Sequence, residues 1–397
     1  MRVLLINPSF YPSETPRAYR WTRICEELVL KGHTIDVVTS ASARSPNSNI
    51  KVYGVGSKHP GHSLKTNKGK GSKMLARIGK YFYRKWMWPD ESMFWARKAE
   101  VKIKSLIQEN HYDVCISVSL PMSSHLATYD ALEGQNIPWK IDIGDPFVHH
   151  DINPRNNLLL HSTKNRELEK NIFYACDEIH VTNHALMNFY QKVYPSIGGK
   201  LHVTSHVHSP LPKNNEHRSQ NPKLLLGYFG SFYNHVREPD LIIKFIQTLN
   251  QLGRETELHI YGNTSSNNKL KISSKNGSCK VLFFESVKRS QVVAQMRTMD
   301  VLINIDNNSE MQLPSKIADY LISGRPIIQL GHSEGGPFEN FCQEFAKPLI
   351  LNSNQSFENS AIMQFLDKAQ HTEVDARCIQ KFLEDYSMEK IAAAFIP

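Results

Sequence analysis

The sequence predicts an α/β protein of two domains, each built on a parallel β-sheet with crossover helices. The chain has 397 residues, of which 40% are hydrophobic. That length is too great for one ordinary core and fits two domains of under about 200 residues each. Short apolar runs alternate with helix-like segments along the chain, which is the pattern of parallel strands joined by helices. A polar stretch with three prolines, 209–222, interrupts this pattern near its middle.

The predicted strands are short runs rich in apolar and β-branched residues. Those before the polar stretch are Val3–Ile6, Ile35–Thr39, Val114–Val118, Trp139–Ile143, Glu178–Val181 and Leu201–Val203. Those after it are Leu224–Phe229, Glu257–Tyr261, Val281–Phe284, Val301–Ile305, Pro326–Leu330 and Pro348–Leu351. Both halves therefore repeat the same strand–helix alternation, although their sequences are not detectably similar.

Helices are predicted where apolar residues recur at helical spacing between these strands. The clearest are Arg17–Lys31, Leu241–Leu252, Ile317–Ser323 and Asp375–Ile396. A glycine directly follows each of the first three, as is common at helix C-termini. We therefore expect an N-terminal domain at 1–208, a linker at 209–222, a second domain at 223–374 and a C-terminal helix at 375–397.

The composition of the chain predicts its cellular location and the state of its cysteines. No run of about 18 apolar residues occurs, so no transmembrane helix is expected. The apolar start of the chain ends at Asn7 and Pro8, too soon for a signal sequence, and we expect a cytoplasmic protein. The six cysteines, at 25, 115, 176, 279, 342 and 378, show neither zinc nor disulfide spacing, and we expect reduced thiols and no metal.

The formal net charge of +9 favours anionic partners, and the positive charge is concentrated in one stretch. Residues 58–84 contain no Asp or Glu and lead into the aromatic run Tyr81–Trp88. Basic residues beside aromatics suit an anionic membrane surface, and we assign 58–88 that role. Single-stranded nucleic acid also binds basic grooves lined with aromatics. A solvated basic loop followed by aromatic residues of the core would have the same composition. We expect no specific nucleic-acid partner.

The segment 313–328 carries the most specific pattern in the chain. Pro314 and Ser315 are residue types that often begin helices, and helix N-termini attract anions. Lys316 would add a full positive charge there, which would suit a diphosphate. A capped helix bearing an exposed lysine would have the same sequence, so spacing alone leaves both interpretations open.

This segment resembles the donor-site signature of family 4 glycosyltransferases of the GT-B class, in the subtype that reads Pro-Ser-Lys, an acidic residue, Tyr-Leu and Gly-x-Pro. The resemblance implies two Rossmann-like domains facing across a cleft, with the C-terminal helix crossing back to the first domain. It implies that Pro314, Ser315 and Lys316 lie at the donor diphosphate. Asp319 takes the place of a glutamate that contacts the nucleotide ribose, and Glu310 lies beside the place of the glutamate that positions the sugar.

The first strand of the second half leads into another part of the expected donor site. Gly230 and Ser231 follow this strand, and a residue without Cβ lets a ligand approach the backbone closely. Arg237 offers a guanidinium fork for phosphate oxygens, and the resemblance implies that it neutralises the leaving diphosphate. A surface arginine after a tight turn is the alternative.

Base recognition is expected from loop contacts further along the second half. We assign it to Tyr261, Gly262 and Val287, which lie at or after the ends of two predicted strands.

Polar residues at the carboxyl ends of strands in the first half are candidates for the acceptor side. The loop after the first strand contains Ser13 and leads into Arg17 and Arg20. The resemblance implies that this loop and an arginine face the acceptor and the donor phosphate, and both arginines are candidates for that role. Asp142 lies near the end of a buried strand and Asp145 just after it, where carboxylates can bind acceptor hydroxyls or accept a proton. We assign Asp142 to the acceptor and Asp145 to catalysis, although Asp145-Pro146 could equally begin a turn.

Together these features predict a glycosyltransferase that moves a sugar from a nucleotide-sugar donor to a glycan or lipid-linked acceptor. The resemblance implies retention of anomeric configuration, no metal and no cofactor apart from the nucleotide-sugar co-substrate. It also implies a role in polysaccharide or glycoconjugate biosynthesis, with the protein peripheral on the inner face of the membrane.

Two other functions remain open. The alternative is a non-catalytic subunit with a degenerate site, which Met311 and Asp319 favour. An epimerase or phosphorylase on the same fold would need paired acid and base groups or a cofactor lysine, and we find no such motif.

Overall fold

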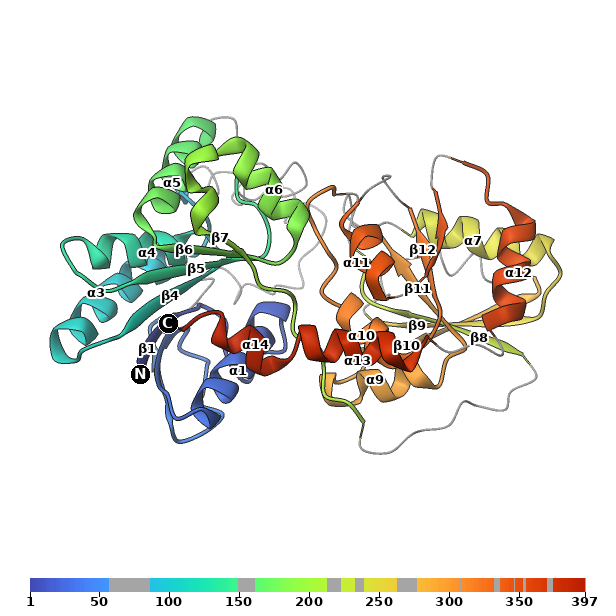
Figure 1. Ribbon diagram of the computed structural model, residues 1–397, viewed down its shortest axis with the longest axis horizontal. Helices are drawn as coiled ribbons and strands as arrows, with labels where there is room; N and C mark the ends of the chain where they lie inside the picture. The colour runs from blue at the N-terminus through green and yellow to red at the C-terminus, as the bar shows by residue number, and fades with distance from the viewer. Residues whose placement is uncertain are drawn as a thin grey trace, which may run out of the picture. The chain divides into compact units, whose positions relative to one another are not determined.

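The computed structural model describes residues 1–56, 86–148, 161–212, 223–232, 239–262, 277–306, 309–331, 336–345, 347–352, 355–369 and 374–396. The chain forms two compact units, and in Figure 1 the first is mainly blue to green with a red C-terminal segment, while the second is mainly yellow to red. The first contains Met1–Ser205 and Met388–Pro397, and the second contains His206–Ser387. The whole basic stretch 58–84, part of the predicted linker and Arg237 lie outside the described residues.

The first unit is built on a seven-stranded parallel sheet with the order β3-β2-β1-β4-β5-β6-β7. Its strands are β1 (Arg2–Ile6), β2 (Thr34–Thr39), β3 (Ile50–Gly54), β4 (Val114–Ser119), β5 (Trp139–Ile143), β6 (Glu178–Val181) and β7 (Leu201–Val203). The strand order changes direction between β1 and β4. In such sheets ligands bind near that point, outside the carboxyl ends of the strands.

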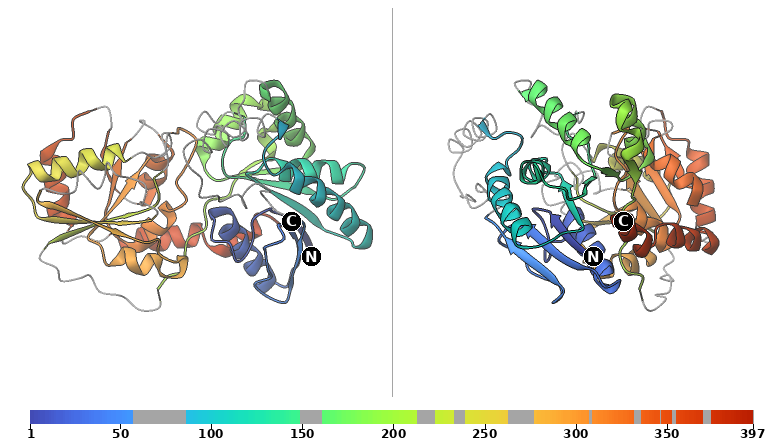
Figure 2. Two further views of the ribbon diagram at one scale, coloured as in Figure 1. Left: turned by 180° about the vertical axis from the view of Figure 1, so that it is seen from behind. Right: turned by 60° about the vertical axis from the view of Figure 1, so that its left-hand side comes forward.

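Helices cover both faces of this sheet (Figures 1 and 2). On one face lie α1 (Pro16–Leu30) and α14 (Met388–Ala393). On the other lie α3 (Met93–Glu109), α4 (Ser123–Leu132) and α5 (Ser162–Ala175), while α6 (His184–Val193) and the 3₁₀ helix η3 (Pro195–Lys200) lead into β7. The last segment of the chain packs on the first helix, since Phe395 meets Trp21 edge to face with ring centroids 4.7 Å apart.

The second unit repeats the architecture with a six-stranded parallel sheet in the order β10-β9-β8-β11-β12-β13. Its strands are β8 (Leu224–Phe229), β9 (Thr256–Tyr261), β10 (Cys279–Phe284), β11 (Val301–Ile305), β12 (Ile327–Leu330) and β13 (Leu349–Leu351). One face carries α7 (Asp240–Gln251) and α12 (Asn359–Ala369). The other carries α9 (Arg289–Arg297), α10 (Ile317–Ser323), α11 (Pro337–Phe345) and α13 (Ala376–Asp385).

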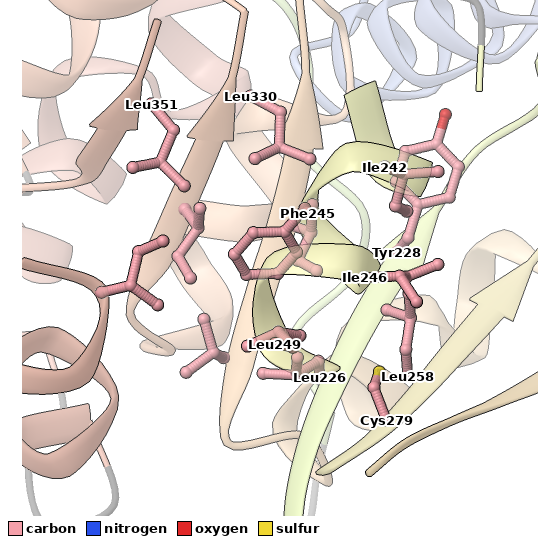
Figure 3. Close-up of a cluster of buried hydrophobic side chains, with 14 of the residues drawn as sticks. Leu226, Tyr228, Ile242, Phe245, Ile246, Leu249, Leu258, Cys279, Leu330 and Leu351 are labelled. Carbon is pink, nitrogen blue, oxygen red and sulfur yellow. The ribbon is translucent and has the colours of Figure 1, made fainter. Parts of the chain in front are cut away.

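Each face of the second sheet has its own apolar core, because successive side chains of a strand point to opposite faces. In β8, Leu226 and Tyr228 join the core beneath α7, where Phe245 lies at the centre of the cluster in Figure 3. Leu225 and Phe229 join the opposite core with α10 and α13. The strand ends that carry the expected donor-site residues are therefore fixed from both sides.

All twelve predicted strands are present, with small differences at their ends. The strand β3 was not predicted, because most of its side chains are only partly buried or exposed. The expected helix Asp375–Ile396 is two helices, α13 in the second unit and α14 in the first. Asp375 caps the first by accepting a 2.9 Å bond from the Arg377 N–H. Ser387, a residue type favoured at helix N-caps, precedes the second.

The chain passes between units at Ser205–His206, shortly before the predicted linker 209–222. Within the described parts of the chain, no helix is long and apolar enough to cross a membrane.

Candidate functional site

The carboxyl ends of β8, β9 and β10 lie close together in the second unit. The Gly230 N–H donates to the Tyr261 carbonyl at 2.8 Å, and the Gly262 N–H donates to the Phe284 carbonyl at 3.2 Å. Gly262 has a φ of +146°, and a Cβ there would lie 2.3 Å from the Gly230 carbonyl oxygen. Only glycine fits this position, and the predicted residues Gly230, Tyr261 and Gly262 are thereby brought into one small area, with Ser231 next in the chain.

Lys316 reaches the same area. Its Nζ lies 4.3 Å from the ring centroid of Tyr228 and 5.3 Å from that of Tyr320. A Cβ placed on Gly230 would lie 3.3 Å from this Nζ, so the lysine head lies directly beside the end of β8. The structure therefore brings together Gly230 and Lys316, which are far apart in the sequence and which the motif assigns to one site.

The start of α10 is held against the sheet by Tyr320. Its hydroxyl donates to the Ile303 carbonyl at 2.9 Å and accepts the Phe229 N–H at 3.1 Å. These bonds link α10 to both β8 and β11 and so fix the position of the backbone that carries Lys316. Pro314 is buried, whereas Ser315 is partly exposed and Glu310 is exposed.

Three aromatic rings form a stack across the sheet beside these glycines. The ring centroids are 4.5 Å apart for Phe229 and Tyr261 and 4.8 Å apart for Tyr261 and Phe284. The Tyr261 hydroxyl accepts a 2.9 Å bond from the Gln295 amide. Tyr261 is thus buried in the unit, so its backbone is the part near the strand end that can meet a ligand. Val287 packs partly buried against the same core.

Asp319 is enclosed by protein in this structure. Its side chain accepts the Ser209 N–H at 2.6 Å and pairs with Arg289 at 3.1 Å. Burial raises the pKa of the Asp319 carboxyl, and Arg289 and the Ser209 N–H oppose that rise. Both oxygens are engaged within the unit, and the ribose contact expected for Asp319 remains a prediction.

In the first unit, three of the four predicted acceptor residues, Arg17, Arg20 and Asp142, form a largely buried charge cluster at the end of β5. The Asp142 carboxylate accepts from Trp21 Nε1 at 2.7 Å, Arg20 Nε at 3.1 Å and Arg17 Nη1 at 3.3 Å. Arg20 also donates to the carbonyls of Thr204, at 2.9 Å, and Ser205. Burial would raise the pKa of Asp142, but the charges of Arg20 and Arg17 and the hydrogen bonds bring it below its usual value.

This enclosure differs from the acceptor contacts that the sequence suggested for Arg20 and Asp142. Their side chains are 3% and 0% exposed, and their polar atoms bind one another and the backbone. The side chain of Arg17 is 17% exposed. Two guanidinium groups share one carboxylate, so the cluster keeps a net positive charge and Arg17 is the member through which an anion could meet it.

Gly144 and Trp21 are site residues that the sequence analysis did not single out. The Arg17 guanidinium lies across Gly144 so closely that a Cβ there would be 0.7 Å from Nη2. Trp21 lies four residues after Arg17, on the same side of α1, and this helical spacing was the available signal. Asp145, just after Gly144, is partly exposed, and Ser13 is exposed in the loop before α1.

Within the part of the chain that the structure describes, no three His, Cys, Asp or Glu side chains come together in a way that could hold a metal ion.

No protein-family model and no curated protein sequence matches the chain. Solved structures do match it along its whole length. HepE from Anabaena, solved with UDP-glucose, is 11% identical with a TM-score of 0.63, over 100% of this chain and 98% of that one. The lipopolysaccharide outer core galactosyltransferase WaaB is 12% identical with a TM-score of 0.61, over 98% and 97%.

WaaG, a glycosyltransferase involved in lipopolysaccharide biosynthesis, is 14% identical with a TM-score of 0.55, over 98% and 95% of the two chains. Identities this low establish a shared fold and leave the activity open. The two successive parallel sheets agree with this likeness. The chain therefore has the GT-B fold, with two Rossmann-like domains.

Proposed function

We propose that the protein is a glycosyltransferase that moves a sugar from a nucleotide-sugar to a glycan or lipid-linked acceptor. The observation that carries the proposal is the position of Lys316, whose Nζ lies beside Gly230 at the carboxyl end of β8. A cation held there can bind the oxygens of a diphosphate. UDP-glucose in the HepE structure, and the glycosyltransferases WaaB and WaaG, support the choice of ligand class.

In the proposed reaction, the bond between the anomeric carbon and the diphosphate oxygen breaks while the acceptor oxygen bonds to that carbon. Lys316 and Arg237 stabilise the negative charge that develops on the departing diphosphate, an effect worth roughly 2.7–4 kcal/mol per donor in comparable oxyanion sites. Asp145 is the candidate to receive the acceptor's proton. We propose retention of configuration, with attack on the face that the leaving group departs from.

The test is turnover by single-site variants. We first screen a panel of UDP- and GDP-sugars for thermal stabilisation and then measure nucleotide release with acceptor mixtures. Lys316→Ala and Arg237→Ala should each lower turnover by more than about tenfold without lowering the unfolding temperature. Lys280→Ala is the matched control, because that side chain is 60% exposed on β10. Near wild-type rates in both variants would place the phosphate site elsewhere.

A non-catalytic nucleotide-sugar-binding subunit is the second candidate. It is favoured by Asp319, because the carboxylate oxygens expected to bind the ribose already bind Arg289 and the Ser209 N–H. Such a protein would be stabilised by a nucleotide-sugar but would release no nucleotide with any acceptor. Binding without turnover would therefore replace the enzyme proposal with this one.

We also propose that the protein works in the cytoplasm on the inner face of a membrane, through the stretch 58–88. Trp86 is 77% exposed and Phe94, on α3, is 45% exposed, and these rings could enter the headgroup region beside the basic residues. Sedimentation with vesicles should require anionic lipid and weaken with added salt. Binding to neutral vesicles alone, or no binding, would remove this proposal.

A further inference from the structure

We propose that Glu169 is a positioning residue that holds the segment 144–148, and with it Asp145, at the carboxyl end of β5. The role of Asp145 in transfer rests on the proposed function above. The attachment of the segment to Glu169 does not depend on the proposed function, and it can be measured without turnover.

Glu169 lies on α5 with only 1% of its surface exposed, and both of its carboxylate oxygens are used. Oε2 accepts the backbone N–H of Val148 at 3.2 Å. Oε1 accepts the hydroxyl of Tyr194 at 3.0 Å. The carboxylate therefore links the segment after β5 to the residue that follows α6, and it does so in a place that water does not reach.

The segment is held at both of its ends. At the first end, the Gly144 carbonyl accepts the Thr182 hydroxyl at 3.4 Å, and the Arg17 guanidinium packs against Gly144. At the other end is the bond from Val148 to Glu169, next to the buried Phe147. Asp145 stands between these two attachments and is partly exposed. Fixing both ends of so short a segment determines where the Asp145 carboxylate can lie.

Burial makes the charge of Glu169 sensitive to pH near neutrality, and the groups around the carboxyl act against that effect. The phenols of Tyr190, on α6, and Tyr194, just after it, interact with Glu169, and the charge of Asp145 acts on Tyr190. Arg166, on α5, acts on Tyr194. Burial raises the pKa of Glu169 to about 7, while the Tyr194 hydroxyl and the N–H groups of the segment limit the rise.

Protonation changes what Glu169 can do for the segment. The ionised carboxylate accepts hydrogen bonds at both oxygens, whereas the protonated acid carries a donor on one of them. Hydrogen bonds to a charged acceptor are also the stronger ones. We therefore expect the segment to be held more firmly above pH 7 than below it.

The first measurement follows the Val148 amide by NMR in protein labelled with ¹⁵N-valine. In the wild type, its chemical shift should titrate with a midpoint near pH 7. Glu169→Gln, which is neutral at every pH, should abolish that titration. Glu167→Gln, an exposed neighbour on the same helix, should leave it unchanged. A Val148 amide whose chemical shift at about pH 8.5 is the same in the wild type and in Glu169→Gln would overturn the proposal, because the bond from Val148 to Glu169 would then be absent.

The second measurement is turnover against pH with the donor found by screening. In the wild type, kcat should fall as the pH drops below about 7. Glu169→Gln should lower kcat about tenfold, leave the donor KM unchanged and show no such fall of kcat at acidic pH. Glu169→Asp, which keeps the charge but is too short to reach Val148, should also lose kcat. An unchanged kcat and pH profile in Glu169→Gln would refute the positioning role while leaving the transferase proposal intact. If no donor turns over, the transferase proposal fails and the Val148 titration still decides whether Glu169 holds the segment.

Discussion

Replacing Asp142 by asparagine tests whether the cluster at the end of β5 is structural. The substitution removes the carboxylate that Arg17 and Arg20 share and leaves the Arg20 guanidinium, 3% exposed, without its counter-charge. Breaking a buried ion pair by removing one partner costs roughly 3–5 kcal/mol. Arg20 keeps two carbonyl acceptors, Thr204 and Ser205, so we expect the lower end, about 3 kcal/mol.

The loss should depend on pH in one direction. The pKa of Asp142 is lowered in the folded protein, so its contribution is fully present above the unfolded value of about 3.9. That contribution is lost as the pH falls through the lower, folded pKa. The unfolding free energies of wild type and Asp142→Asn should therefore differ most near neutral pH and converge in strong acid.

Urea unfolding monitored by tryptophan fluorescence provides the assay, since Trp21 donates directly to Asp142. The control is Glu26→Gln, which breaks the surface pair between Arg23 and Glu26, whose side chains are 37% and 34% exposed. That control should cost at most about 1 kcal/mol. If Asp142→Asn costs no more than the control and instead weakens acceptor binding, the structural interpretation is wrong and the acceptor role suggested by the sequence is right.

Two glycine substitutions test the close approaches at the strand ends. Gly144→Ala should force the Arg17 guanidinium off the segment after β5 and lower the unfolding free energy by about 1–3 kcal/mol. Gly199→Ala is the control, because a Cβ at Gly199 would have no atom within 4 Å, and it should have little effect in the same urea titration. Gly262→Ala should separate the ends of β8 and β9, because its Cβ would meet the Gly230 carbonyl, and thermal stabilisation by the nucleotide-sugar should fall. Wild-type stabilisation in Gly262→Ala would show that the ligand does not depend on this edge.

The strands of this fold are predictable because their apolar runs are short, separate and mostly buried on both faces. The missed strand β3 illustrates the limit, since a half-exposed edge strand differs little from a loop in composition. The break between α13 and α14 was missed for a similar reason. Apolar residues recur at helical spacing on both sides of Ser387, so the pattern alone does not show that the chain changes unit there.

The candidate site was predictable where a motif joins distant residues and less so where partners depend on packing. The resemblance assigns Gly230, which follows a predicted strand, and Lys316, at the start of a predicted helix, to one site, and the structure brings them together. It also places Arg20 and Asp142 at one sheet edge, but only the packing of α1 on β5 determines that they bind each other. Glu169 carries no sequence signal, because a single acid on an amphipathic helix is usually a surface residue.

The return of α14 to the first unit makes the second unit an insertion within the first. A fragment that ends at Ser205 would lack the segment whose Phe395 covers Trp21, so the first domain cannot be isolated intact by one cut. The polypeptide passes from one domain to the other twice, at Ser205–His206 and at Ser387–Met388. Any movement of one unit relative to the other must therefore bend the backbone at two places, whereas a single connection would require only one.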